Sequence, residues 1–155
     1  MDLIKCLTDR FYRYVAVASQ SDATVKTVPT SKGQTVLANM LADELRELGL
    51  TDVCVDEHSC VYATLKGNCN GPVVGFLAHL DTVDVALSPE IHPQIIHYEG
   101  GDVVLNKEKN IIMKLSEHPE LQDFIGEDII FSDGTSVLGA DDKSAIANIM
   151  TMLEV

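Results

Sequence analysis

Apolar residues recur at helical spacing in the first third of the chain. Over residues 3–18 they lie three and four positions apart, which predicts an amphipathic helix with one buried face. A second stripe of this kind covers residues 36–48. Ser31 and Gln34 form a capping-box pattern before it, and Gly49 ends it. We therefore expect two helices that pack against a sheet.

Shorter apolar stretches predict strands after the second helix. Val53 and Val55 alternate with polar residues, and residues 61–65 form a second candidate. Residues 73–78, with the sequence VVGFLA, are typical of a central strand covered on both faces. Residues 81–128 are irregular and interrupted by proline and glycine, and we interpret them as a functional loop region.

Two more elements are predicted near the end of the sequence. Residues 129–131 and 137–138 flank an Asp-Gly turn, which predicts a short hairpin. Apolar residues at helical spacing over 145–153 predict a last helix that begins near Asp142. The order of the elements favours an α/β fold in which helices pack on a mixed β-sheet, as an αβα sandwich.

Composition narrows the functional classes. The chain is 46% hydrophobic and 23% charged, which is typical of a globular domain. It contains neither an apolar stretch of about 20 residues nor a secretion signal, so we expect a cytoplasmic protein with no membrane partner. A formal net charge of −13 opposes binding to nucleic acid. The cysteines lack the paired spacing of a zinc knuckle, and we expect free thiols at Cys6, Cys54, Cys60 and Cys69.

The first candidate for chemistry is His79-Leu80-Asp81, at the carboxyl end of the predicted central strand. Open α/β sheets bind their ligands at such ends. Residues two apart in an extended backbone point to the same side, so we expect the Asp81 carboxylate to approach the His79 imidazole. A carboxylate in that position orients a metal-bound histidine. A structural histidine is the alternative. Surface positions without a metal are expected for His92, His97 and His118.

The second candidate is Gly139-Ala140-Asp141-Asp142-Lys143, where the last helix begins. Two adjacent carboxylates repel each other and favour a compensating cation. One carboxylate can bridge two metal ions, as in two-metal hydrolytic sites. Asp141 is the better ligand candidate. For Asp142 a helix N-cap is an equally good interpretation.

With these motifs in place, the sequence resembles the amino-terminal part of the peptidase T family, tripeptide aminopeptidases within the wider family of dizinc peptidases and deacylases. His-x-Asp and Gly-Ala-Asp-Asp belong to the wider family, whereas the segment containing Gly100-Gly101-Asp102 and the Val28-Pro29-Thr30 segment make peptidase T the closer likeness. The segments that carry the resemblance are Arg10-Phe11, Tyr14-Val15, Val28-Pro29-Thr30-Ser31, Gly33-Gln34, Glu47-Leu48-Gly49-Leu50, His79-Leu80-Asp81-Thr82, and residues 98–102 and 135–143.

The resemblance implies a zinc-dependent aminopeptidase with two zinc ions and a tripeptide substrate. His79 would bind one zinc, Asp141 would bridge both, and Asp81 would be the auxiliary catalytic carboxylate. Residues 1–155 would be the amino-terminal portion of the catalytic domain, with the rest of that domain and a lid domain absent. The fragment alone is then expected to be inactive, because the glutamate base and further ligands are missing. The alternatives are a related dizinc N-acyl amino acid deacylase and a non-catalytic fragment that self-associates as a homo-oligomer.

Overall fold

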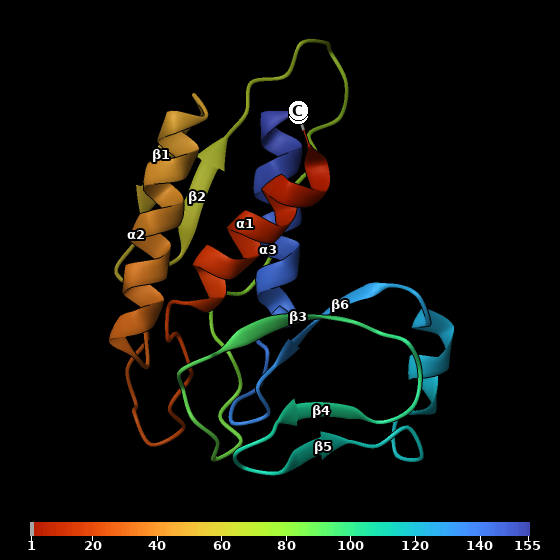
Figure 1. Cartoon of the computed structure of the whole chain (residues 1–155). Helices are drawn as coiled ribbons and strands as arrows, with labels where there is room; N and C mark the ends of the chain where they lie inside the picture. Colours follow the sequence, from red (N-terminus) through yellow and green to blue (C-terminus); the bar gives the residue numbers. More distant parts are fainter. Residues whose placement is uncertain (1) are drawn as a thin grey trace. The chain divides into compact units, whose positions relative to one another are not determined.

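The computed structural model describes residues 2–155, which form two compact units. The first unit comprises residues 2–85 together with Gly139–Val155, and the second comprises Ala86–Leu138. Figure 1 shows helices and strands in both units, so the predicted α/β class is confirmed. All paired strands form two-stranded antiparallel sheets.

Three helices and one hairpin make up the first unit. The helices are α1 (Leu3–Val15), α2 (Lys32–Glu47) and α3 (Ala140–Glu154), and the hairpin joins β1 (Thr51–Val55) to β2 (Val61–Thr64). Helix α1 packs against α3, and α2 packs against both strands of the hairpin. The apolar faces of the helices provide the core, which contains Tyr14, Val15, Leu37, Leu41, Ile146 and Met150.

The helix ends follow the sequence pattern with two differences, the first of which is that α1 ends at Val15 and not at residue 18. The Asp2 carboxylate caps α1 by accepting a hydrogen bond from the Lys5 backbone N–H at 3.1 Å. Ser31 is the N-cap of α2, but its hydroxyl forms no cap bond. The Gln34 side chain instead accepts from the Thr30 N–H at 3.0 Å, so the capping box is not formed as predicted. Gly49, with φ of +82°, follows the end of α2.

The prediction of a buried strand over residues 73–78 is wrong for this structure, because these residues form neither strand nor helix. Their large apolar side chains are exposed, with Leu77 at 97%, and Ala78 is half-buried. A strand exists only beside a neighbouring strand that satisfies its backbone groups, and none of the described residues takes that place.

The second unit contains more regular structure than its sequence indicates. Strand β3 (Pro93–His97) pairs with β6 (Asp128–Ser132), and β4 (Val103–Asn106) pairs with β5 (Ile111–Met113). A 3₁₀ helix, η1 (Pro119–Phe124), precedes β6. The interpretation of residues 81–128 as an irregular loop region is therefore wrong. Tyr98, Val103, Leu121 and Phe131 form the core of this unit.

The predicted hairpin around the Asp-Gly turn is also wrong. Residues 137–138 form no strand, and β6 pairs with β3 instead. The turn itself exists: Gly134 has a φ of +78°, and the Asp133 carboxylate accepts hydrogen bonds from the backbone N–H and hydroxyl of Thr135. The Asp-Gly pattern therefore predicted the turn, but it did not predict that β6 pairs with β3.

Two findings concern membrane-spanning helices and cysteines in the described part of the chain. None of its helices combines the length and the apolar character needed to cross a bilayer. All four cysteines are free thiols, as predicted.

Gly33, in the first turn of α2, is expected to tolerate no side chain. A Cβ at this position would overlap the backbone carbonyl oxygen of Ala18. Replacing an interior helical glycine with alanine normally stabilises a protein by about 0.5–1 kcal/mol. Here the overlap should reverse the sign, and we expect Gly33→Ala to lower the free energy of unfolding by about 1–3 kcal/mol, the usual cost of overpacking.

Urea unfolding followed by circular dichroism checks this prediction. Lys32→Ala is the matched control, because Lys32 is the exposed neighbour in the same turn. We expect that control to stay within about 0.5 kcal/mol of the parent chain. A Gly33→Ala protein as stable as the control would contradict the close approach of α2 to Ala18.

Candidate functional site

The His79–Asp81 segment is held by the loop that follows α1. The buried Ser19 hydroxyl donates to the Leu80 carbonyl at 2.7 Å, and the Thr82 N–H donates to the Ser19 carbonyl at 3.3 Å. The Ser21 N–H donates to the Thr82 carbonyl at 2.9 Å. This short parallel contact fixes the backbone next to His79, although the residues before it are unpaired.

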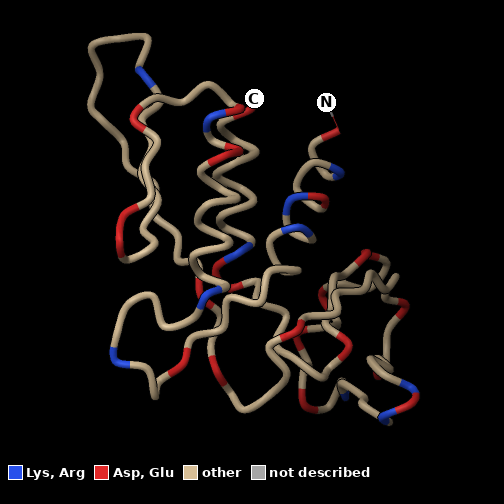
Figure 2. Tube along the Cα trace, turned by 90° about the vertical axis from the view of Figure 1, so that its left-hand side faces the viewer, with Lys and Arg blue, Asp and Glu red and all other residues tan. Residues whose placement is uncertain are grey.

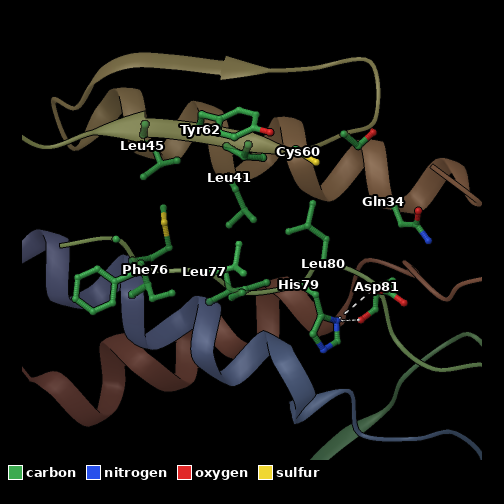
Figure 3. A pocket seen from close by; sticks show the side chains of 18 of the residues that line it. Gln34, Leu41, Leu45, Cys60, Tyr62, Phe76, Leu77, His79, Leu80 and Asp81 are labelled. Atoms are coloured by element: carbon green, nitrogen blue, oxygen red, sulfur yellow. Dashed lines mark hydrogen bonds and ion pairs between the residues drawn. The ribbon is translucent and has the colours of Figure 1, made fainter. Parts of the chain in front are cut away.

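The two ring nitrogens of His79 face different carboxylates. Nδ1 lies 3.1 Å from Asp81 Oδ1 and 2.9 Å from the Asp81 carbonyl oxygen. Nε2 lies 2.9 Å from Asp141 Oδ1. The structure thus brings together the three predicted site residues, which come from two distant parts of the sequence. Figure 3 shows His79 and Asp81 side by side at one end of a groove.

The position of Asp141 requires a cation or a proton between it and His79. If His79 donates its Nδ1 proton to Asp81, Nε2 of the neutral ring presents a lone pair to Asp141. Two acceptors 2.9 Å apart repel each other unless a positive centre joins them. Burial lowers the pKa of His79, but the hydrogen bond to Asp141 and the charges of Asp81 and Asp142 outweigh it and hold the pKa above 6.5. The same pair of atoms suits a metal ion.

The start of α3 places both aspartates outside regular helix geometry. Gly139 has a φ of +71°, and Asp141 and Asp142 have non-helical backbone angles. Oδ2 of Asp142 accepts a hydrogen bond from the His79 backbone N–H at 3.2 Å. The N-cap position of α3 is occupied by Gly139, and the hydrogen bond of the Asp142 carboxylate goes to the His79 segment. Asp142 instead connects the helix to the histidine segment.

Lys143 is a feature of the site that sequence reasoning missed. Its side chain is fully buried, and Nζ donates to the Val17 carbonyl at 2.8 Å. Burial lowers the pKa of Lys143 to about 8. The bond ties the first turn of α3 to the end of α1. A signal was present, because Lys143 lies three positions before Ile146 and seven before Met150, on the buried face of the helix.

A groove of about 1000 Å³ adjoins His79 in the first unit. It lies between β2 and residues 74–81, and side chains of α2 and α3 also line it. Leu41 and Leu45 of α2 project toward it, opposite Phe76 and Leu77 (Figure 3). The groove is mainly apolar, whereas His79 and Asp81 supply polar groups at one end.

The donor set fits a zinc ion in part. Imidazole nitrogen and carboxylate oxygen are ordinary zinc ligands, and the Asp141 side chain is 95% exposed and free to bind. Within residues 2–155, however, no three histidine, cysteine or acidic side chains are grouped so that they could hold a metal ion. His92, His97 and His118, expected on the surface, belong to the second unit and share no such group. The site therefore holds two donors and one orienting carboxylate.

Comparisons with known proteins identify relatives of this chain. No family model matches it. It is 55% identical over 149 residues to a peptidase T-like protein of Yersinia pestis, which covers 96% of this chain and 36% of that protein. It is 53% identical to a peptidase T-like protein of Rhizobium meliloti over 95% of this chain and 36% of that protein. With peptidase T of Clostridium botulinum the identity is 46% over 97% of this chain and 38% of that protein. The chain thus spans little more than a third of the length of these relatives.

Proposed function

We propose, from the premise that this chain is homologous to peptidase T over almost its whole length, that it is part of a longer zinc-dependent aminopeptidase. The substrate would be a tripeptide, from which the amino-terminal residue is released. The observation that carries the proposal is the position of His79 between Asp81 on Nδ1 and Asp141 on Nε2. The cytoplasmic location expected from the sequence belongs to the same proposal.

Each residue of the site has a distinct role in this proposal. His79 would bind one zinc ion through Nε2, and Asp141 would bridge two ions through its two oxygens. Asp81 would hold the imidazole in the correct tautomer by accepting the Nδ1 proton. Bound zinc would supply an activated water and stabilise negative charge on the attacked carbonyl oxygen. Asp142 would hold the His79 backbone in place through its N–H.

The chain alone supplies too few groups for this chemistry. A catalytic zinc generally has three protein ligands and a water, and His79 with Asp141 gives two ligands to one ion and one to the other. The carboxylates that bond to His79 among the described residues belong to Asp81, Asp141 and Asp142, and none is a glutamate. We infer that the remaining ligands and the base come from the part of the longer relatives that has no counterpart in this chain.

We therefore predict that the isolated 155-residue chain binds zinc weakly and hydrolyses no tripeptide. Isothermal titration calorimetry with zinc and a ninhydrin assay for released amino acid check the two statements. His79→Ala should remove the weak binding that remains. Tight binding of two zinc ions per chain would contradict the argument that the ligand set is incomplete.

A chimera tests the proposed activity itself. In it, these 155 residues replace the matching segment of the Yersinia protein. We expect the zinc-loaded chimera to release the amino-terminal residue of tripeptides and to leave N-acyl amino acids intact. Hydrolysis of N-acyl amino acids without hydrolysis of tripeptides would favour the related deacylase. That enzyme would use the same metal site. A folded chimera with neither activity would contradict the proposal.

A further inference from the structure

The loop formed by residues 16–21, which follows α1, supports the histidine half of the candidate site. The Ser19 hydroxyl donates to the carbonyl of Leu80, the residue directly after His79, at 2.7 Å. The Ser19 carbonyl oxygen in turn accepts from the Thr82 N–H at 3.3 Å. Ser19 is fully buried, so water does not compete for these bonds. Ser19 therefore fixes the backbone beside His79 to this loop.

The aspartate half of the site is attached to the same loop through Lys143. This side chain is fully buried, and its Nζ donates to the Val17 carbonyl at 2.8 Å. Lys143 closely follows Asp141 in the first turn of α3, so the bond holds the start of this helix against the loop. Because Val17 and Ser19 are close neighbours in the loop, the two halves of the site have a common support.

The loop is itself held by two helices. It continues directly from α1, and the Ala16 N–H still donates to the Tyr12 carbonyl at 3.1 Å. Helix α2 approaches the loop so closely that a Cβ on Gly33 would overlap the Ala18 carbonyl oxygen. Closely packed elements deform little. The loop therefore provides a rigid base for the groups that are attached to it.

Stability alone does not explain a lysine at position 143. Burial of an ammonium group costs free energy unless a carboxylate is paired with it. Acidic residues lie along much of the trace (Figure 2), yet the hydrogen bond of the Lys143 ammonium group within the described residues goes to the Val17 carbonyl. An apolar side chain of similar length would fill the same space without this cost. The contribution of Lys143 is therefore the directed bond that fixes the start of α3.

We propose that Ser19 and Lys143 are positioning residues of the candidate metal site. By fixing both halves of the site to residues 16–21, they set the distance between His79 and Asp141, which is 2.9 Å from Nε2 to Oδ1. Their polar groups bond to backbone carbonyls, so they act through the two metal-binding side chains and not on the substrate. This inference rests on the proposed function, because it concerns the same zinc site.

Amide hydrogen exchange in the zinc-free chain tests the positioning role without catalysis. The His79 backbone N–H donates to Asp142 Oδ2 at 3.2 Å, so its exchange rate reports whether the two halves of the site stay together. Ser19→Ala removes the hydroxyl donor. Lys143→Met keeps the length of the side chain but removes its ammonium group. We expect the His79 N–H to exchange at least about threefold faster in each variant than in the parent chain.

Thr151→Val is the matched control. Thr151 is also buried in α3, and its hydroxyl accepts a hydrogen bond from Arg10 of α1 at 2.9 Å. It lies about 12 Å further along the helix than Lys143, away from the aspartates. The control removes a buried bond between the same two helices, so it should lower the stability of the chain. It should leave the exchange of the His79 N–H unchanged.

The chimera with the Yersinia protein gives a second readout. Ser19→Ala and Lys143→Met should each lower its zinc affinity and its kcat about 10–100-fold, the usual scale for groups that orient metal ligands. KM should change little, because no contact with the tripeptide is removed. Loss of either bond already separates the two halves of the site, so the double variant should lose less than the product of the two single effects.

The outcomes separate this inference from the proposed function. Exchange of the His79 N–H in either variant that is as slow as in Thr151→Val would overturn the positioning role. Losses in zinc affinity that multiply in the double variant would also overturn it, because the two bonds would then act on separate supports. An inactive parent chimera would contradict the proposed function alone, since the exchange rates in the zinc-free chain still decide the positioning role.

Discussion

Replacing Glu44 with alanine is expected to lower the free energy of unfolding by about 3–5 kcal/mol, the usual cost of removing one partner from a buried ion pair. Glu44 is 8% exposed, and its carboxylate accepts hydrogen bonds from Arg10 at 2.7 Å, Tyr14 at 2.7 Å and Arg13 at 3.0 Å. Arg10 also bonds to Thr151 and Glu154 of α3. The substitution would leave the buried Tyr14 hydroxyl without its acceptor and would remove one of the acceptors of the buried Arg10 guanidinium.

Urea unfolding of the parent chain and the variant measures this loss. Glu47→Ala is the control, because Glu47 lies in the same helix with an exposed side chain. We expect the control to change the free energy of unfolding by less than about 0.5 kcal/mol. Equal losses in the two variants would mean that the network joining the three helices contributes nothing measurable.

The pKa of Glu44 gives the pH dependence of the same network. Burial alone raises that pKa, but the hydrogen bonds from Arg10 and Tyr14 and the charges of the two arginines outweigh burial and lower it below 4.5. A carboxylate with a lowered pKa in the folded state stabilises the fold above its unfolded pKa. The contribution should therefore be complete above about pH 4.5 and be lost as the pH falls through the folded value.

The local part of the fold was predictable from the sequence. The positions of α1, α2, β1 and β2 follow from short-range periodicity and from residues such as Gly49. These elements satisfy their own backbone groups or those of a near neighbour. The pairing of β3 with β6 was not predictable in this way, because two other strands lie between them in the sequence.

Residues 73–78 show the same limit in a different form. Their apolar pattern predicts a buried strand, yet a pattern carries no information on whether a neighbouring strand is available. The relatives are more than twice as long as this chain. Residues 73–78 are exposed because none of the described residues forms a strand beside them.

The candidate site was predictable where the signal was short. His79 and Asp81 are two residues apart, and an extended backbone alone brings them together. The placement of Asp141 beside them depends on the packing of α3 and entered through the family resemblance. The anchoring bonds of Ser19 and Lys143 to backbone carbonyls were missed, because each joins segments far apart in the sequence.

Alanine at His79 or Asp141 is expected to abolish tripeptide hydrolysis in the chimera with the Yersinia protein. His79→Ala removes the imidazole ligand of one zinc ion, and Asp141→Ala removes the carboxylate proposed to bridge both. Zinc content should fall by about one ion per chain in the first variant, and both ions should be affected in the second. If His79 were only a structural residue in contact with a surface carboxylate, these substitutions would change neither the zinc content nor the rate of tripeptide hydrolysis.

Two further variants separate orientation from ligation in the same chimera. Asp81→Ala removes the acceptor of the His79 Nδ1 proton and should cost about 10–100-fold in zinc affinity or activity while both ions still bind. Asp142→Asn keeps an oxygen that can accept from the His79 N–H, so near-normal turnover is expected. Zinc analysis and turnover are measured on the same preparations. Two bound zinc ions and full turnover in both the His79→Ala and Asp141→Ala proteins would refute the metal assignment and leave His79 as a structural residue.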